Sequence, residues 1–147
     1  MQDLLKPLES QRKHLEEGLD EAFQNYIKKK YGYACIVSGE KKSGTIFYLF
    51  GCTMYPNTRW NEFNAVTLCR RERDRYYEGH PFAVLDWYVK TLGQEKIDEL
   101  RSIAEGKTKV YSIQEIINMT NYYIKRTREL PAVKAFNGRI VKWVYLP

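Results

Sequence analysis

FYLFGCTMYPNTRWNEFN, residues 47–64, joins a strand-like segment to a helix-like one. The run before Gly51 is aromatic and apolar, which is typical of a β-strand. A turn that contains Pro56 follows, and Arg59 then stands near the start of a segment, residues 58–77, that we expect to be helical. One arginine therefore lies where a strand passes into a helix, and the neighbouring elements decide its role.

A long helix is expected before this stretch, over residues 1–30. Its apolar residues recur at helical spacing, and acidic residues occupy the other side. Three lysines, residues 28–30, end the segment, and Gly32 follows; cations and a glycine both suit a helix C-terminus. The apolar positions are Leu4, Leu8, Leu15, Leu19, Phe23, Tyr26 and Ile27.

Three strands are expected in the middle of the chain. Residues 33–38 and 45–52 are β-branched or aromatic runs joined by a short glycine-bounded loop, which indicates an antiparallel hairpin. Residues 82–89 are apolar on both faces apart from Asp86, which favours a central strand beside Gly51. Both the predicted fold and the family resemblance described below depend on this third strand.

The last third of the chain is predicted to hold two helices and a hairpin. Residues 94–104 read as a short helix, and Ser112 with Glu115 forms a capping box that starts a helix ending near Arg128. Asn137-Gly138 between β-prone runs predicts a terminal hairpin.

The predicted fold class is α+β, in which helices cover a small mixed β-sheet made of the N-terminal hairpin plus the third strand. A length of 147 residues predicts a single domain, 1–147. Within it we expect the N-terminal helix at 1–30, a core at 31–128 and a C-terminal hairpin at 129–147.

The composition indicates the class of protein and the compartment in which it works. A hydrophobic fraction of 44% and a charged fraction of 29% are typical of an ordinary globular chain, with no run long enough to span a membrane. The cysteines are odd in number and lack CxxC spacing, which predicts reduced thiols in the cytoplasm or nucleus. They are Cys35, Cys52 and Cys69.

The net charge of +6 is concentrated near the C-terminus. Residues 106–147 carry eight basic and two acidic side chains, whereas the two preceding regions are each balanced. This excess is either a solvated surface or an electrostatic footprint for a polyanion, with interleaved aromatic residues available to stack on bases.

The middle of the chain resembles the GIY-YIG nuclease superfamily, and within it the phage- and virus-type branch. Gly32-Tyr33-Ala34-Cys35 is similar to the first motif, Leu49-Phe50-Gly51 to the second and Pro56-Asn57-Thr58-Arg59 to the third. Further along, His80-Pro81-Phe82 and Gln94-Glu95-Lys96-Ile97 are also similar to that branch. The resemblance covers residues 31 to about 125.

The resemblance implies metal-dependent hydrolysis of a phosphodiester. Glu95 would hold one Mg²⁺ or Mn²⁺ ion, Tyr33 would assist deprotonation of the nucleophile, and Arg59 would bind the phosphate. Arginine suits that role because its planar guanidinium meets phosphate oxygens bidentately. From the residues alone, Asp86 and Glu99 are alternative acids, Arg59 could equally be a surface arginine packed on Trp60, and Glu95 could simply favour the helix N-terminus.

The chain also departs from the family pattern. The motif tyrosine falls on Cys35 and the polar residue of the second strand on Leu49, so we expect the catalytic set to be degenerate. The preferred hypothesis is a nucleic-acid-binding protein with a nuclease-like fold, with DNA as the expected partner and no cofactor. An active DNA endonuclease using Mg²⁺ or Mn²⁺ and a small protein-interaction module are the alternatives. The predicted nucleic-acid contacts are Arg59, Arg70, Arg71, Arg73, Arg75, Lys125, Arg126, Arg128, Lys134 and Lys142.

Overall fold

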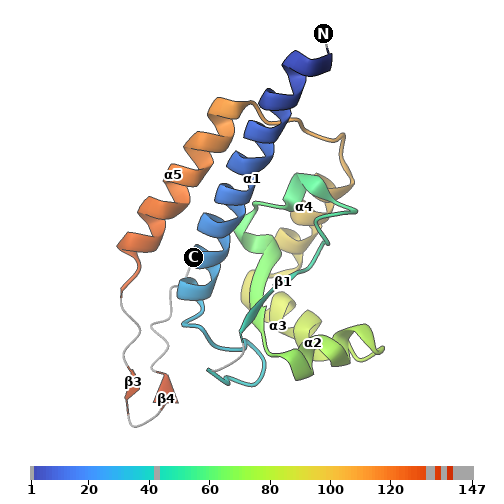
Figure 1. Ribbon diagram of the computed structural model, residues 1–147. Coiled ribbons are helices and arrows are strands. Elements are labelled where there is room, and N and C mark those ends of the chain that lie inside the picture. The colour runs from blue at the N-terminus through green and yellow to red at the C-terminus, as the bar shows by residue number, and fades with distance from the viewer. Residues whose placement is uncertain (1, 42–43, 132–134, 137–138, 141–147) are drawn as a thin grey trace.

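The computed structural model describes residues 2–41, 44–131, 135–136 and 139–140 (Figure 1). It is a mixed helix and strand structure in which the helices predominate. Helices are α1 (Gln2–Lys30), α2 (Arg70–Tyr77), α3 (Phe82–Leu92), α4 (Gln94–Glu105) and α5 (Ile113–Glu129), and strands are β1 (Thr45–Tyr48), β2 (Ala65–Leu68), β3 (Ala135–Phe136) and β4 (Arg139–Ile140). Two 3₁₀ turns, Pro56–Thr58 and Glu62–Asn64, lie between β1 and β2.

The two long helices α1 and α5 pack side by side and run in the same direction (Figure 1). Near their N-terminal ends, Arg12 donates a hydrogen bond to the carbonyl oxygen of Tyr111. Near their C-terminal ends, Lys29 Nζ donates to the carbonyl oxygen of Thr127 over 2.8 Å. The parallel arrangement therefore brings both C-termini to the same end of the molecule.

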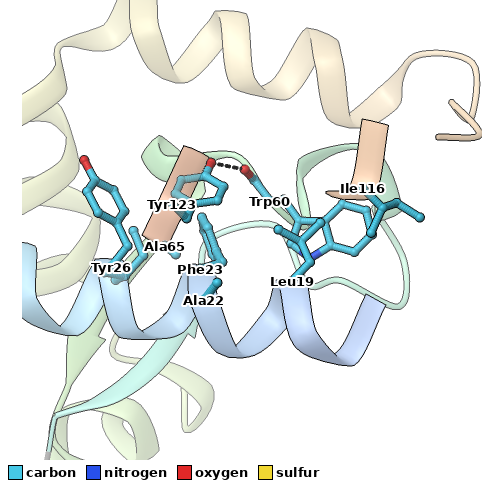
Figure 2. Close-up of a cluster of buried hydrophobic side chains, with 9 residues drawn as sticks. Leu19, Ala22, Phe23, Tyr26, Trp60, Ala65, Ile116 and Tyr123 are labelled. Carbon is cyan, nitrogen blue, oxygen red and sulfur yellow. Dashed lines mark hydrogen bonds between the residues drawn. The ribbon is translucent and has the colours of Figure 1, made fainter. Parts of the chain in front are cut away.

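The first hydrophobic core lies between α1, α5 and the segment that joins β1 to β2 (Figure 2). The Phe23 and Tyr123 rings meet edge to face with centroids 5.1 Å apart, and the Tyr123 hydroxyl donates to the carbonyl oxygen of Trp60. Burial of such aromatic side chains contributes about 1.5–3 kcal/mol each. The buried members are Leu19, Ala22, Phe23, Tyr26, Ile27, Trp60, Ala65, Ile116 and Tyr123.

The small sheet separates this core from a second one. Strands β1 and β2 pair antiparallel, with Thr45 opposite Leu68 and Tyr48 opposite Ala65, and every residue of β2 is buried. The second core lies on the side of α3, and its buried members are Cys35, Ile36, Phe47, Val66, Leu68, Cys69, Val84 and Tyr88.

The prediction of a three-stranded sheet is wrong, because the main sheet has two strands and its second strand is β2. Residues 33–38 form turns: Gly32 has φ 64°, its N–H donates to the Lys29 carbonyl, and the Tyr33 N–H donates to the Lys28 carbonyl. These two bonds make a Schellman cap that ends α1. The glycine and tyrosine of the first motif thus terminate a helix and do not open a strand.

The strand predicted at residues 82–89 is also wrong, since this segment lies within the helix α3. Its two buried residues, Val84 and Tyr88, are four apart, which is helical spacing, while Phe82, Leu85 and Val89 remain exposed. A short run that is apolar on every side does not distinguish a buried strand from a helix. The helix expected over residues 58–77 is wrong in its first part, which contains the 3₁₀ turn Glu62–Asn64 and β2, and only α2 is α-helical.

The strand predicted over residues 45–52 is present only as β1, Thr45–Tyr48, and the remaining predicted elements are confirmed. α1 and α4 occupy the expected segments, and Ser112 accepts a hydrogen bond from the Glu115 N–H at the start of α5. β3 and β4 pair antiparallel, as predicted for the terminal hairpin.

The Schellman cap gives a direct stability test. Gly32→Ala forces an L side chain into the left-handed region and should lower the free energy of unfolding by about 1–2 kcal/mol. Gly18→Ala is the matched control: Gly18 lies within α1, and a Cβ there meets nothing within 4 Å. It should raise stability by about 0.5–1 kcal/mol. Urea unfolding followed by circular dichroism measures both, and equal effects of the two substitutions would contradict the cap.

Candidate nucleic-acid interface

The turn after Tyr55 is held to the end of α4 by one side chain. Asn57 Nδ2 donates to the carbonyl oxygens of Ile103 and Lys107, each over 3.0 Å, and Asn57 Oδ1 accepts from the Lys109 N–H over 2.8 Å. Carbonyl groups at a helix C-terminus lack partners within the helix, and this amide supplies one. Asn57 therefore fixes residues 57–60, which we call the junction, against α4.

Arg59, the next polar residue of the junction after Thr58, is directed at α1. Its Nε donates to Asp20 Oδ1 over 3.0 Å and its terminal nitrogen forms a 2.5 Å ion pair with Asp20 Oδ2. The Trp60 indole N–H donates to Asp20 Oδ1 over 2.8 Å, and Glu16 lies 3.8 Å from the guanidinium. The Arg59 guanidinium also lies 4.8 Å from the centre of the Trp60 ring.

These contacts determine the electrostatic state of Arg59. Partial burial opposes its charge, but the hydrogen bonds and negative charge of Asp20 outweigh burial and raise the pKa of Arg59 above its usual value. The guanidinium N–H groups that would bind a phosphate are already hydrogen-bonded to the Asp20 carboxylate. The role that the geometry gives Arg59 is therefore to join the β1–β2 connection to α1.

Tyr33 and Glu95, the other two predicted catalytic residues, lie on different elements. Tyr33 follows the end of α1 and is 51% exposed, and Glu95 is exposed in the first turn of α4. Among the hydrogen bonds and ion pairs of the described residues, none joins either side chain to Arg59. The part of the chain that the structure describes contains no group of three or more His, Cys, Asp or Glu side chains arranged to hold a metal. Glu95 belongs to no such group.

The arginines of α2 have partners within the protein. Arg73 donates to the Ile46 carbonyl over 2.7 Å and so ties α2 to β1. Arg71 and Arg75 both lie within 4 Å of the buried carboxylate of Glu72, at 3.7 and 3.8 Å. Arg70 is 93% exposed and reaches Asp74 at 3.9 Å. Most of the positive charge predicted to bind nucleic acid here is thus compensated locally.

The C-terminal ends of α1 and α5 carry a different kind of cluster, which we call the basic end. It comprises Lys28, Lys29, Lys30, Lys125, Arg126 and Arg128. Among the described residues, the carboxylates at this end are those of Glu62, which pairs with Lys30 at 3.6 Å, and of Glu129. Lys125 and Arg128 are exposed. Positive charge therefore exceeds negative charge at this end of the helix pair.

The buried Tyr26 hydroxyl links an acidic and a basic side chain beside the basic end. The Tyr26 hydroxyl donates to Glu62 Oε2 over 2.8 Å and accepts from an Arg126 terminal nitrogen over 3.3 Å. Burial, reinforced by Glu62, raises the pKa of Tyr26 to about 12, so its hydroxyl stays protonated at neutral pH. Burial also lowers the pKa of Lys30, against the opposing effect of Glu62. The Tyr26 hydrogen bond raises the pKa of Arg126.

Sequence reasoning found only part of this cluster. Lys125, Arg126 and Arg128 were predicted, and the predicted Lys134 and Lys142 lie outside the described residues. Lys28, Lys29 and Lys30 were missed because their run was interpreted as complementing the dipole of α1 alone. Only the parallel packing of α1 on α5 adds them to the charges of α5. Asp20 was missed too, since nothing in its local sequence marks it as the partner of Arg59.

No family model, no curated protein and no solved structure matches this chain. Within the described residues, no helix is both long and apolar enough to cross a membrane. The resemblance to the GIY-YIG superfamily stays a prediction. The two segments that it required to be strands, 33–38 and 82–89, are not strands in the structure.

Substitution of the two carboxylates that face Arg59 should lower stability by different amounts. Asp20→Ala removes the acceptor of both Arg59 and Trp60 and should lower the free energy of unfolding by about 2 kcal/mol, because hydrogen bonds to charged groups are worth about 1.5–3 kcal/mol. Glu16→Ala removes the 3.8 Å ion pair with Arg59 and a partly exposed i,i+4 pair with Arg12, and should cost less than about 1 kcal/mol. Urea unfolding measures both. Equal losses would mean that general charge attraction, and not the Asp20 hydrogen bonds, holds the junction.

Proposed function

We propose that this chain binds nucleic acid, with DNA as the expected partner, through the basic end of the α1–α5 pair. The observation that carries the proposal is the parallel packing of these helices, supported by the Lys29–Thr127 hydrogen bond. It adds the lysines of α1 to the cations of α5 within one surface, and such a surface attracts the phosphates of a nucleic acid.

A purely structural role explains part of this charge. Each helix presents the negative end of its dipole here, and a cation near such an end is worth about 0.3–1 kcal/mol. Lys29, Lys30 and Arg126 have defined partners and serve that role. Lys125 and Arg128 point to solvent and are the side chains best able to meet phosphates.

An exposed aromatic ring adjoins these cations. Tyr122 is 49% exposed on α5, and its ring centre lies 6.0 Å from the Arg126 guanidinium. A ring beside cations can stack on an unpaired base, an interaction worth about 1–3 kcal/mol. The proposal therefore includes single-stranded as well as duplex DNA, and the relative affinity for the two reports how much the ring contributes.

Cleavage does not enter the proposal, because the Arg59 guanidinium is engaged by Asp20 and Glu95 belongs to no group of three or more possible metal ligands among the described residues. The endonuclease hypothesis stays open to a simple assay: supercoiled plasmid is incubated with the protein and Mn²⁺, with Glu95→Gln as the control. Nicking that Glu95→Gln abolishes would restore the enzyme hypothesis.

Removal of three cations from the basic end tests the proposed function. The triple variant Lys28→Gln, Lys125→Gln and Arg128→Gln should weaken binding to a fluorescent oligonucleotide, measured by anisotropy over a range of salt concentrations. It should also reduce the slope of log K against log salt by up to about three units, one for each phosphate that the protein no longer neutralises.

A control of equal charge is available on the rest of the surface. The variant Lys13→Gln, Lys90→Gln and Lys107→Gln removes three exposed lysines away from the C-termini of α1 and α5. It should leave both affinity and slope nearly unchanged. Equal effects of the two triple variants would show that only net charge matters. Binding that neither variant alters, or that does not depend on salt, would favour a protein-interaction module.

A further inference from the structure

Two buried cysteines meet beside the first turn of α2. Cys35 lies in the turn after α1, and Cys69 is the residue immediately before α2; their exposed fractions are 0% and 2%. The segments that carry them are held together, because the Ile36 N–H donates to the Thr67 carbonyl over 3.0 Å. Both belong to the second hydrophobic core.

Ser38 contacts both sulfur atoms. Its backbone N–H is 3.5 Å from Cys35 Sγ, and its hydroxyl oxygen is 3.7 Å from Cys69 Sγ. Gly39, with φ 78°, turns the chain back so that the Cys35 N–H donates to the Glu40 carbonyl over 2.9 Å. The same short turn thus contacts both thiols.

The environment of Cys35 differs from that of a cysteine in an ordinary apolar core. Burial raises the pKa of a thiol, but at Cys35 hydrogen-bond donors outweigh burial and lower the pKa. The donors are the Ser38 hydroxyl and the backbone N–H groups of Cys69, Ser38 and Val37. Converging backbone N–H groups form an anion-binding site, and here the anion they favour is the thiolate.

We propose that Cys35 and Cys69 form a reversible, peroxide-sensitive thiol pair. The Cys35 thiolate attacks one oxygen of hydrogen peroxide, and the O–O bond breaks to leave a sulfenic acid on Cys35 and a hydroxide ion. The Cys69 thiol then attacks the Cys35 sulfur, and a disulfide forms as water leaves. Two thiols are oxidised by two electrons and one peroxide is reduced to two waters, once hydroxide has taken up the proton that Cys35 released.

Neither thiol is open to solvent in the folded chain, so hydrogen peroxide reaches the pair through local opening of the neighbouring turn. The neighbouring turn, Ser38, Gly39 and Glu40, is exposed and has no helix or strand. The disulfide would join this turn covalently to the start of α2, so oxidation would fix the segment that follows α1 against the second core.

Cys52 is an internal reference for the chemistry. It is the more accessible thiol, only partly buried, but burial raises its pKa. Exposure alone would make Cys52 the first cysteine to oxidise, whereas the proposal makes Cys35 the first.

Peroxide oxidation of the full chain tests the proposal. Reduced protein is treated with hydrogen peroxide near neutral pH, unfolded in N-ethylmaleimide and digested for mass spectrometry. The expected result is a Cys35–Cys69 peptide pair, reversed by dithiothreitol, with Cys52 still alkylated. Cys52→Ser should give the same linkage, and Cys69→Ser should leave a Cys35 sulfenic acid that dimedone traps.

Oxidation of Cys52 ahead of Cys35, or full alkylation of Cys35 and Cys69 after excess peroxide, would overturn the proposal. If Cys69→Ser fails to fold, the linkage in the unsubstituted chain and in Cys52→Ser still decides, because neither needs a change in the second core.

Discussion

The contact between Asp20 and the Arg59–Trp60 pair is the constraint on which the rest of the structure depends. One carboxylate of α1 accepts from the guanidinium and from the indole of two consecutive residues. The residues around this contact extend it: Asn57 is bonded to the end of α4, and the Trp60 carbonyl accepts from Tyr123 of α5. Four residues of the chain, 57–60, thus join α1, α4 and α5, and the strand that follows them pairs with β1. The charges are only partly exposed, so their hydrogen bonds are less screened than those of a surface ion pair.

The elements whose ends are marked by capping or turn residues could be predicted from the sequence. The lysines before Gly32, the Ser112–Glu115 capping box and the Asn137-Gly138 turn each mark a boundary by a short-range mechanism, and the structure has each boundary near the expected residue. The errors have other causes. Residues 82–89 are apolar on both faces apart from Asp86, a pattern that fits a strand or a helix. Residues 33–38 are β-prone but begin at the Schellman cap that ends α1, and the cap overrides that propensity. β2 was missed because its strand is only four residues long and lies between a 3₁₀ turn and a helix.

The candidate site shows the same limit. The cations of α5 could be predicted from the distribution of charge along the sequence, but their grouping with Lys28 and Lys29 depends on the direction in which α1 packs. Arg59 was singled out from the sequence as a phosphate-binding residue, and the structure pairs it with Asp20. Its partner is a carboxylate 39 positions earlier in the chain, and such a long-range pair has no local signature. The arrangement therefore favours a structural role for the junction and moves the candidate interface to the basic end.

The most direct test of this view is a double-mutant cycle between Asp20 and Arg59. The free energy of unfolding is measured by urea for the unsubstituted chain, Asp20→Ala, Arg59→Ala and the double variant. If the contact joins α1 to the β1–β2 connection, the two substitutions should show a coupling of about 1–3 kcal/mol, because the second substitution costs little once the first has removed the pair. Effects that add to within about 0.5 kcal/mol would contradict that central role, since independent sites behave in that way.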